Sequence, residues 1–238
     1  MFASNDNLHI VTVSDWLASL VKQSFLGGKD IRVIKNGVDL DVFKPNESKR
    51  KKSLVAGKKL VIGVAGVWTK AKGLDDIYKL REKLSQDEFE IILVGLKESQ
   101  KKELPNGITG IGRTESIEEL VNLYSSANVL VNPTYADTFP TVNLEALACG
   151  TPIVTYQTGG SPEAVDEKTG IVVEQGNVES LSEAIVSLCE KSKAQMINDC
   201  RQKAVDEFDK NERYKDYFSV YKDVVGGIFD TWSRCSLD

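Results

Sequence analysis

Histidine and cysteine are scarce in this sequence. Among 238 residues there is one histidine, His9, which argues against a Ser-His-Asp triad and against a histidine-based metal site. The four cysteines, Cys149, Cys189, Cys200 and Cys235, have spacings that fit no zinc-binding pattern. Nothing in the sequence indicates secretion, so we expect reduced thiols and no bound metal.

Long apolar runs and a basic leader are also missing. No apolar stretch approaches the roughly 20 residues that span a membrane, and the start, Met1–Asp6, lacks the positive charge of a signal peptide. Acidic residues outnumber basic ones, 35 to 30, and the net charge of −5 argues against nucleic acid as the main partner. The sequence therefore predicts a soluble, cytoplasmic, globular protein.

Short apolar runs alternate with helical patterns from Leu60 onwards. The expected strands are Leu60–Ala65, Glu90–Val94, Gly107–Gly112, Val129–Asn132, Pro152–Tyr156 and Thr169–Val173. The expected helices are Leu74–Leu84, Ile117–Ser125, Pro140–Cys149, Val178–Lys191, Lys193–Phe208 and Asn211–Val225. This alternation predicts the α/β class, with a Rossmann-like parallel sheet, helices on both of its faces, and additional C-terminal helices.

The first part of the chain is too small for a core of its own. It holds two expected strands, His9–Val13 and Ile31–Ile34, and between them a helix of about eleven residues capped by Ser14. We interpret residues 1–58 as the remnant of a preceding domain and a linker, residues 59–192 as the Rossmann-like domain, and residues 193–238 as a C-terminal helical segment that leaves apolar surface exposed. The basic run Lys49–Lys52 is a solvated linker or, in a second interpretation, an electrostatic contact with anionic membrane lipid.

The two best-known phosphate-binding signatures, G-x-G-x-x-G after a strand and G-x-x-x-x-G-K-[ST], are absent. Another anion site is nevertheless indicated. Pro140 suits the first position of a helix, and Ser161-Pro162-Glu163 suits the N-cap, N1 and N2 positions of a second helix. Both N-termini would lie at the carboxyl edge of the sheet, where open α/β sheets bind ligands and where free amides favour a phosphate.

Charged side chains flank this expected anion site. Asp137 and Glu145 are unsuited to phosphate, but a carboxylate can accept hydrogen bonds from both hydroxyls of a vicinal diol. Lys70 and Lys72 follow the first strand of the sheet and can balance the charge of a diphosphate, the alternative being two solvated lysines. A diphosphate between two polyols, as in a nucleotide sugar, would use all of these groups.

The residues that carry these features also resemble a known family. The matching segments are Asn36-Gly-Val-Asp39, Phe43-Lys-Pro45, Gly66 with Lys72-Gly73, Asp137-Thr-Phe-Pro-Thr-Val-Asn-Leu-Glu145 through Gly150, Gly159-Gly160-Ser-Pro-Glu163 and Thr169-Gly170. Together they resemble the C-terminal, donor-binding half of a retaining GT-B glycosyltransferase of family 4. The similarity is strongest to bacterial enzymes that build capsule, O-antigen or exopolysaccharide.

The resemblance implies a reaction and a set of site residues. A sugar would pass from a UDP- or GDP-sugar to a saccharide or lipid-linked acceptor with retention of configuration, without a metal, and Asp137 and Lys72 would be catalytic. Glu145 would hold the ribose, and the base would rest near Gly112 and Arg113. The implied donor-binding residues are Gly66, Lys72, Gly112, Arg113, Asp137, Thr138, Phe139, Pro140, Thr141, Val142 and Glu145.

Three departures from the family pattern keep other interpretations open. The first acid of the family motif is usually Glu but is Asp137 here. The residue after the glycine of the first loop is usually Arg but is Val67 here. We also expect the acceptor-binding N-terminal domain to be missing, which would leave half of a two-domain cleft. A second interpretation is a non-catalytic nucleotide- or partner-binding module with a decayed site, and a third is a nucleotide-sugar epimerase. Peripheral association with the inner face of a membrane also remains open, and Trp68 could either pack in the core or line the cleft.

Overall fold

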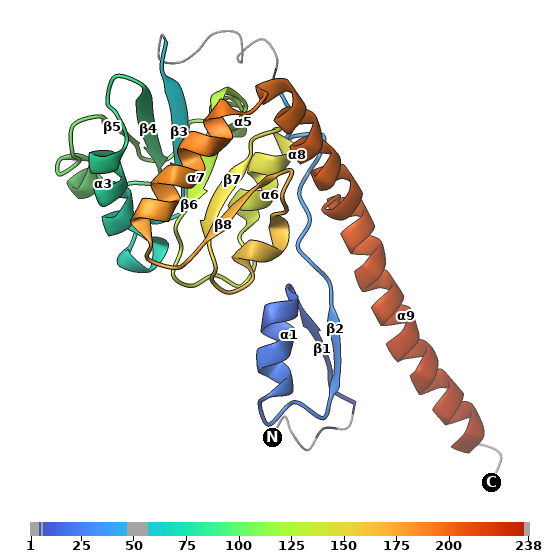
Figure 1. Ribbon diagram of the computed structural model, residues 1–238. Helices are drawn as coiled ribbons and strands as arrows, with labels where there is room; N and C mark the ends of the chain where they lie inside the picture. Colours follow the sequence, from blue (N-terminus) through green and yellow to red (C-terminus); the bar gives the residue numbers. More distant parts are fainter. Residues whose placement is uncertain (1–4, 6, 47–56, 236–238) are drawn as a thin grey trace.

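The centre of the structure is one parallel sheet. The computed structural model describes residue 5, residues 7–46 and residues 57–235, with residues 227–235 by their backbone alone. Six strands lie in the order β5-β4-β3-β6-β7-β8 (Figure 1). They are β3 (Lys59–Val64), β4 (Phe89–Val94), β5 (Ile108–Ile111), β6 (Val129–Asn132), β7 (Ile153–Tyr156) and β8 (Gly170–Val173). The predicted α/β fold class is confirmed.

The strand order reverses between β3 and β6. These two strands pair directly, with Val61 opposite Val129 and Ile62 opposite Leu130. The chain leaves β3 towards β4 on one side and leaves β6 towards β7 on the other, so the loops after β3 and β6 diverge. A crevice forms at such a switch point, outside the carboxyl ends of the strands, and open α/β sheets bind their ligands there.

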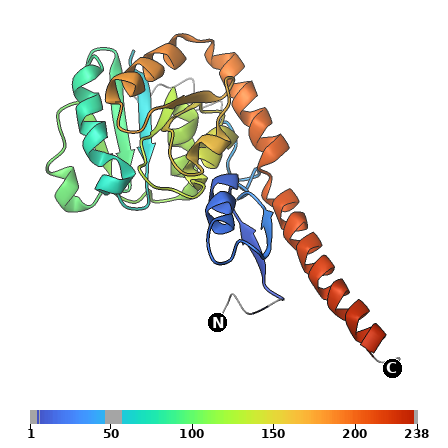
Figure 2. The same cartoon turned by 60° about the horizontal axis from the view of Figure 1, so that its bottom comes forward.

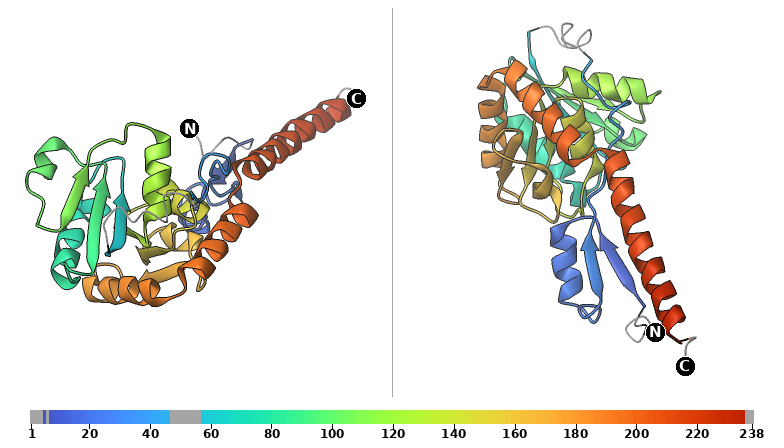
Figure 3. Two further views of the ribbon diagram at one scale, coloured as in Figure 1. Left: turned by 90° about the horizontal axis from the view of Figure 1, so that it is seen from above. Right: turned by 90° about the vertical axis from the view of Figure 1, so that its right-hand side faces the viewer.

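Helices cover both faces of this sheet, as Figure 3 shows from above. The helical segments of this part of the chain are η1 (Lys70–Lys72), α3 (Leu74–Lys83), α4 (Glu98–Lys101), α5 (Ile117–Ser126), α6 (Thr141–Ala148), η2 (Ser161–Ala164), α7 (Val178–Glu190) and α8 (Lys193–Glu207). The helices α3 and α7 pack on one face, where Ile77 and Ile185 are fully buried. The helices α5 and α6 pack on the other face, where Tyr124 and Leu147 are fully buried. Sequence reasoning missed η1 and α4, because one short turn shows no apolar period.

The N-terminal unit lies below the carboxyl edge of the large sheet (Figures 1 and 2). It contains β1 (His9–Thr12), α1 (Asp15–Lys22) and β2 (Asp30–Val33), with β1 and β2 in a separate parallel sheet. Ser14 caps α1 as expected, but the helix has 8 residues instead of about eleven. The interpretation as a domain remnant and the three domain boundaries stay predictions, and the basic run Lys49–Lys52 lies outside the described residues.

The last helix, α9 (Lys210–Cys235), extends past the sheet and runs beside the N-terminal unit (Figure 3). It is longer than the expected helix Asn211–Val225. The carboxylate of Asp223 on this helix forms an ion pair with Arg32 of β2 at 2.8 Å. The helix carries the exposed aromatic residues Tyr214 and Phe218, in line with the expected exposure of apolar surface. Within the described part of the chain, none of the helices combines the length and apolar character that a membrane span requires.

Gly73 joins η1 to α3 and allows a close approach of two loops. It has a φ of +77°, and a Cβ atom at this position would lie 2.1 Å from the carbonyl oxygen of Pro133. Only glycine tolerates both conditions without displacement of the backbone. The loop after β3 therefore lies directly against the loop after β6.

Replacement of this glycine tests how much the contact contributes. We expect Gly73→Ala to lower the free energy of unfolding by about 2 kcal/mol or more, from positive-φ strain and from the clash with Pro133. Gly28→Ala is the matched control, because Gly28 has no positive φ and a Cβ atom added there would meet nothing within 4 Å. It should change the stability by no more than about 0.5 kcal/mol. Equal effects of the two substitutions in urea unfolding would contradict the account.

Candidate functional site

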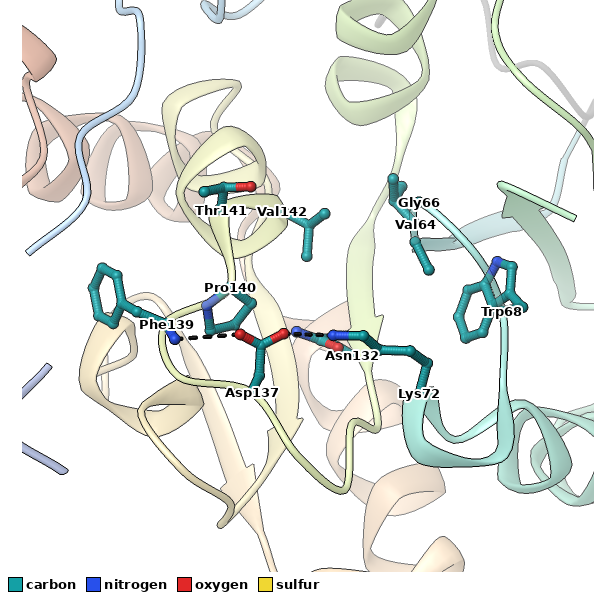
Figure 4. Close-up of a pocket in the computed structure, with 11 residues that line it drawn as sticks. Val64, Gly66, Trp68, Lys72, Asn132, Asp137, Phe139, Pro140, Thr141 and Val142 are labelled. Atoms are coloured by element: carbon teal, nitrogen blue, oxygen red, sulfur yellow. Dashed lines mark hydrogen bonds and ion pairs between the residues drawn. The ribbon is translucent and has the colours of Figure 1, made fainter. Parts of the chain in front are cut away.

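A cavity of about 290 Å³ lies at the switch point, between the loops that follow β3 and β6 (Figure 4). Seven of the residues predicted from the sequence line it: Gly66, Lys72, Asp137, Phe139, Pro140, Thr141 and Val142. The structure adds Val64, Ala65, Trp68 and Asn132. Segments about 70 residues apart in the chain thus meet at one edge of the sheet, as the parallel topology requires.

Lys72 and Asp137 form an ion pair across this cavity. The ammonium nitrogen of Lys72 lies 2.6 Å from Oδ2 of Asp137, and the side chains are 35% and 17% exposed. The other oxygen, Oδ1, accepts a hydrogen bond from the backbone amide of Phe139 at 3.2 Å. The side chain of Lys70, in contrast, is 91% exposed, and its ammonium lies 4.0 Å from the carboxylate of Asp75. The geometry thus separates the two candidate lysines, since only Lys72 lines the cavity.

The start of α6 differs by one position from the prediction. Pro140 is the N-cap residue, with a φ of −68° and an extended ψ of 120°, and Thr141 is the first helical residue. Proline suits either place, because its φ fits both, and here its carbonyl accepts from the amide of Asn143 at 3.2 Å. Among the residues that the structure describes, the amides of Thr141 and Val142 donate to no protein acceptor. These two residues line the cavity, so the positive end of α6 faces it.

The predicted second helix at Ser161 is wrong. Residues Ser161–Ala164 form a single 3-10 turn, η2, with Gly160 as its N-cap. The turn stops at once because Asp166 begins a hydrogen-bonded turn to Thr169 that leads into β8. One α-helical N-terminus, that of α6, therefore lies at this place instead of two.

Glu163 has a role that its position in the sequence did not indicate. Its carboxylate accepts hydrogen bonds from the backbone amides of Asp15 at 3.0 Å and Trp16 at 2.8 Å, at the start of α1. Lys35 lies 3.9 Å from the same carboxylate and 6.0 Å from the ring centre of Phe139. Glu163 therefore caps a helix of the N-terminal unit and joins that unit to the loops of the site.

A buried carboxylate ties the two loops of the cavity together. Asp76 of α3 is 3% exposed and accepts from the phenol groups of Tyr135 at 2.6 Å and Tyr156 at 3.0 Å. The ammonium of Lys79 also donates to Asp76, at 3.0 Å. Burial raises the pKa of Asp76, but the hydrogen bonds from Tyr135, Lys79 and Tyr156 outweigh it and lower the pKa below its ordinary value. The pKa of Tyr135 rises to about 12, mainly through its hydrogen bond to Asp76. The backbone amide of Tyr135 also donates to the carbonyl of Ala71 at 2.8 Å. Ala71 precedes Lys72 and Tyr135 stands two residues before Asp137, so these contacts fix the ion pair.

A second polar network lies under the cavity. Asn132 at the end of β6 donates to Asn143 of α6 at 2.9 Å, and Asn143 donates to the hydroxyl of Ser161 at 3.2 Å. The hydroxyls of Ser161 and Thr155 are 2.7 Å apart. All four side chains are buried. Sequence reasoning missed this network; the signal was an asparagine at the end of an apolar strand and another within an apolar helix.

A second cavity of about 540 Å³ adjoins the first, with Val64, Ala65 and Gly66 in the walls of both. It extends to the ends of β4 and β5, and the predicted residues Gly112 and Arg113 line it. Trp68 was expected either to pack in the core or to line the cleft, and it does both: its side chain is buried, with 3% exposed, and it lines the first cavity. Its indole nitrogen donates to the carbonyl of Val94 at 2.8 Å.

Glu145 and Thr138 are not among the residues that line these two cavities. Glu145 is half-buried on α6, and Oε2 accepts a hydrogen bond from Tyr124 of α5 at 2.9 Å. Burial raises the pKa of Glu145, and the hydrogen bond from Tyr124 partly offsets this effect. Leu120, one helical turn before Tyr124, lines the second cavity. The carboxylate therefore lies between α5 and α6, one helical turn of α5 from a residue that lines the second cavity.

Comparison with known proteins now decides the family. Residues 45–206, well over half of the chain, match the family described as Glycosyl transferases group 1. The chain belongs to this family. A D-inositol 3-phosphate glycosyltransferase of Corynebacterium jeikeium is 30% identical over 206 residues, which are 77% of this chain and 49% of the relative. One of Paenarthrobacter aurescens is 31% identical over 174 residues, 66% of this chain and 43% of the relative. The chain thus spans about half the length of the curated relatives it matches.

Solved structures agree on the fold. Sucrose-phosphate synthase of Thermosynechococcus elongatus superposes with a TM-score of 0.80 and 22% identity, over 91% of this chain and 58% of that one. HepE of Anabaena, in complex with UDP and glucose, superposes with a TM-score of 0.76 and 19% identity, over 90% of this chain and 62% of that one. The C-terminal domain of a glycosyl transferase group 1 family protein of Francisella tularensis superposes with a TM-score of 0.61 and 22% identity, over 73% of this chain and 99% of that one. The family match and these neighbours support a GT-B glycosyltransferase C-terminal domain.

The raised pKa of Glu145 makes stability depend on pH. The folded protein favours the protonated carboxyl, so its contribution is fully present below the ordinary pKa of 4.5 and is lost as the pH rises through the folded value. Relative to the wild type, Glu145→Gln should therefore gain stability when unfolding is measured at pH 8 instead of pH 4. A difference between the two proteins that does not change with pH, or that changes in the opposite direction, would contradict this.

Proposed function

We propose that this chain is the donor-binding domain of a retaining glycosyltransferase of family 4. The complete enzyme would transfer a sugar from a UDP- or GDP-sugar to a saccharide or lipid-linked acceptor. One observation carries the proposal: the ion pair of Lys72 and Asp137 lies in a cavity with free α6 amides, in a chain of the Glycosyl transferases group 1 family. The complex of HepE with UDP and glucose supports a nucleotide-sugar donor. The alternative of a non-catalytic module with a decayed site is not favoured.

The diphosphate is proposed to bind at the start of α6. The amides of Thr141 and Val142 would donate to its oxygens, and Lys72 would turn from Asp137 towards the phosphate charge. Preorganised donors of this kind stabilise the charge on a departing diphosphate by about 3 kcal/mol each. No metal is needed for this step in the proposal, because the ammonium and the helix dipole supply the positive charge.

The other groups are assigned to the two ends of the donor. Asp137 would lie beside the donor sugar, with the backbone from Thr138 to Pro140 around it. Glu145 would accept hydrogen bonds from the ribose hydroxyls. Tyr124 donates to one oxygen of this carboxylate and would thereby orient it for the ribose. Gly112 and Arg113 would adjoin the base.

The acceptor is proposed to bind a preceding GT-B half, which would complete the cleft. Such a half would meet the N-terminal unit, whose capping contact through Glu163 already joins it to the site. We propose a cytoplasmic location, with peripheral contact at the inner face of the membrane when the acceptor is lipid-linked. Retention would be tested in the complete enzyme by NMR of the anomeric proton of the product, and an inverted product would refute it.

Calorimetric titration with UDP, GDP and ADP tests the donor site in this chain. We expect at least one nucleotide to bind, and we expect Lys72→Met and Glu145→Ala each to weaken binding by tenfold or more, about 1.4 kcal/mol. For Lys72 the physical reason is the loss of a cation from a partly buried anion site.

Lys70→Met is the matched control for Lys72→Met. It removes the same charge two residues away, from a side chain that is 91% exposed and does not line the first cavity. We expect it to change the affinity by less than about twofold, because an exposed charge is screened by salt. Equal losses for the two lysines would mean that only the general charge of the loop matters, and the proposed role of Lys72 would fail.

A further inference from the structure

The segment that follows β2 carries the motif Asn36-Gly37-Val38-Asp39, and none of its residues lines the first or the second cavity. Asn36 stands three residues after the end of β2, and its side-chain nitrogen Nδ2 donates to the carbonyl of Phe139 at 3.2 Å. A carbonyl can only accept, so this contact fixes which end of the carboxamide faces the loop after β6. The motif thus connects the N-terminal unit to the loop that carries Asp137.

Phe139 is the point at which this connection reaches the site. Its side chain is buried, and its ring packs on that of Phe208, with the ring centres 5.9 Å apart. Its amide donates to Oδ1 of Asp137 at 3.2 Å (Figure 4). The peptide group between Phe139 and Pro140 therefore joins the carboxylate of Asp137 to the start of α6. A shift of this peptide would displace both the carboxylate and the first amides of α6.

The next residues of the motif hold Asn36 in place. A Cβ atom at Gly37 would lie 2.5 Å from Cα of Lys210, so only glycine allows this approach to the start of α9. The amide of Val38 donates to the carbonyl of Phe208 at 2.7 Å, and the carbonyl of Val38 accepts from the amide of Lys210 at 3.1 Å. Asn36 therefore extends from a segment that is fixed on the junction of α8 and α9, and it can restrain Phe139.

We infer that Asn36 is a positioning residue, which fixes the Phe139 peptide and through it the carboxylate of Asp137 and the first amides of α6; the inference rests on the proposed function. Binding groups must be held within about 0.5 Å of their productive geometry, and neighbouring hydrogen bonds supply this restraint. Because Asn36 follows β2 so closely, the same contact makes the loop after β6 depend on the placement of the N-terminal unit.

Amide hydrogen exchange and nucleotide titration of the full chain test the inference together. Asn36→Ala removes the contact, and Asn36→Asp keeps the size of the side chain but presents only acceptors to the carbonyl of Phe139. We expect each variant to raise the exchange rate of the Phe139 amide at least about fivefold, while the amides of β6 stay within about twofold of the wild type. Each should also weaken, at least about threefold, the binding of whichever of UDP, GDP and ADP the wild type binds.

Asp39→Asn is the matched control in the same motif. It removes the charge that pairs with Lys210, but an amide oxygen can still accept from the amides of Asp41 and Val42. It should leave the Phe139 exchange rate and the affinity within about twofold of the wild type, because a partly exposed ion pair contributes little.

Three results would overturn the inference. They are an unchanged exchange rate of the Phe139 amide in both Asn36 variants, equal effects in Asp39→Asn, and faster exchange in the Asn36 variants with unchanged nucleotide affinity. Failure of the proposed function looks different, since the wild type would then bind none of the three nucleotides at millimolar concentration. In that case the exchange rates alone decide whether Asn36 holds the loop.

Discussion

The structure of the site depends on the attachment of the loop after β6 to the segment that follows β3. The strands β3 and β6 are neighbours, but their loops leave in opposite directions at the switch point. The carboxylate of Asp76 and the carbonyl of Ala71 hold the loop after β6 through the phenol and the amide of Tyr135. Gly73 permits this contact, since any side chain there would meet Pro133. A buried carboxylate that accepts from Tyr135, Tyr156 and Lys79 is costly to disturb, so these hydrogen bonds can define a single arrangement.

This attachment holds two opposite charges in place at the first cavity. Lys72 and Asp137 neutralise each other, and the backbone amides of Thr141 and Val142 at the start of α6 donate to no acceptor among the described residues. In the proposed reaction, a diphosphate would replace the carboxylate as the partner of the ammonium, so binding would exchange one ion pair for another. Such an exchange costs less than the burial of a new charge, and it keeps the cation within reach of the leaving group.

The sequence was sufficient for the architecture, and seven of the eleven residues that line the first cavity were among those predicted from it. Apolar runs such as Val129–Asn132 predicted strands within one or two residues, because burial on both faces leaves a strong signal. The helix at Ser161 failed because good capping residues do not ensure that a helix continues. The hydrogen bond of Tyr135 to Asp76 joins residues that are 59 positions apart in the chain, and that of Asn132 to Asn143 joins a strand to a helix. No local sequence pattern reveals either pair. Glu163 acts on amides that lie 147 residues or more away in the chain, which only the tertiary structure can show.

A double-mutant cycle between Tyr135→Phe and Lys72→Met, read out by the affinity for UDP, tests the central claim most directly. Tyr135 does not line the first cavity, so loss of its hydroxyl can affect the nucleotide only indirectly, through the two loops that its hydrogen bond to Asp76 joins. We expect Tyr135→Phe to weaken UDP binding in the wild-type background and to have less effect in the Lys72→Met background, with a coupling energy of about 1 kcal/mol. Strictly additive losses, or no loss from Tyr135→Phe in a folded protein, would contradict it.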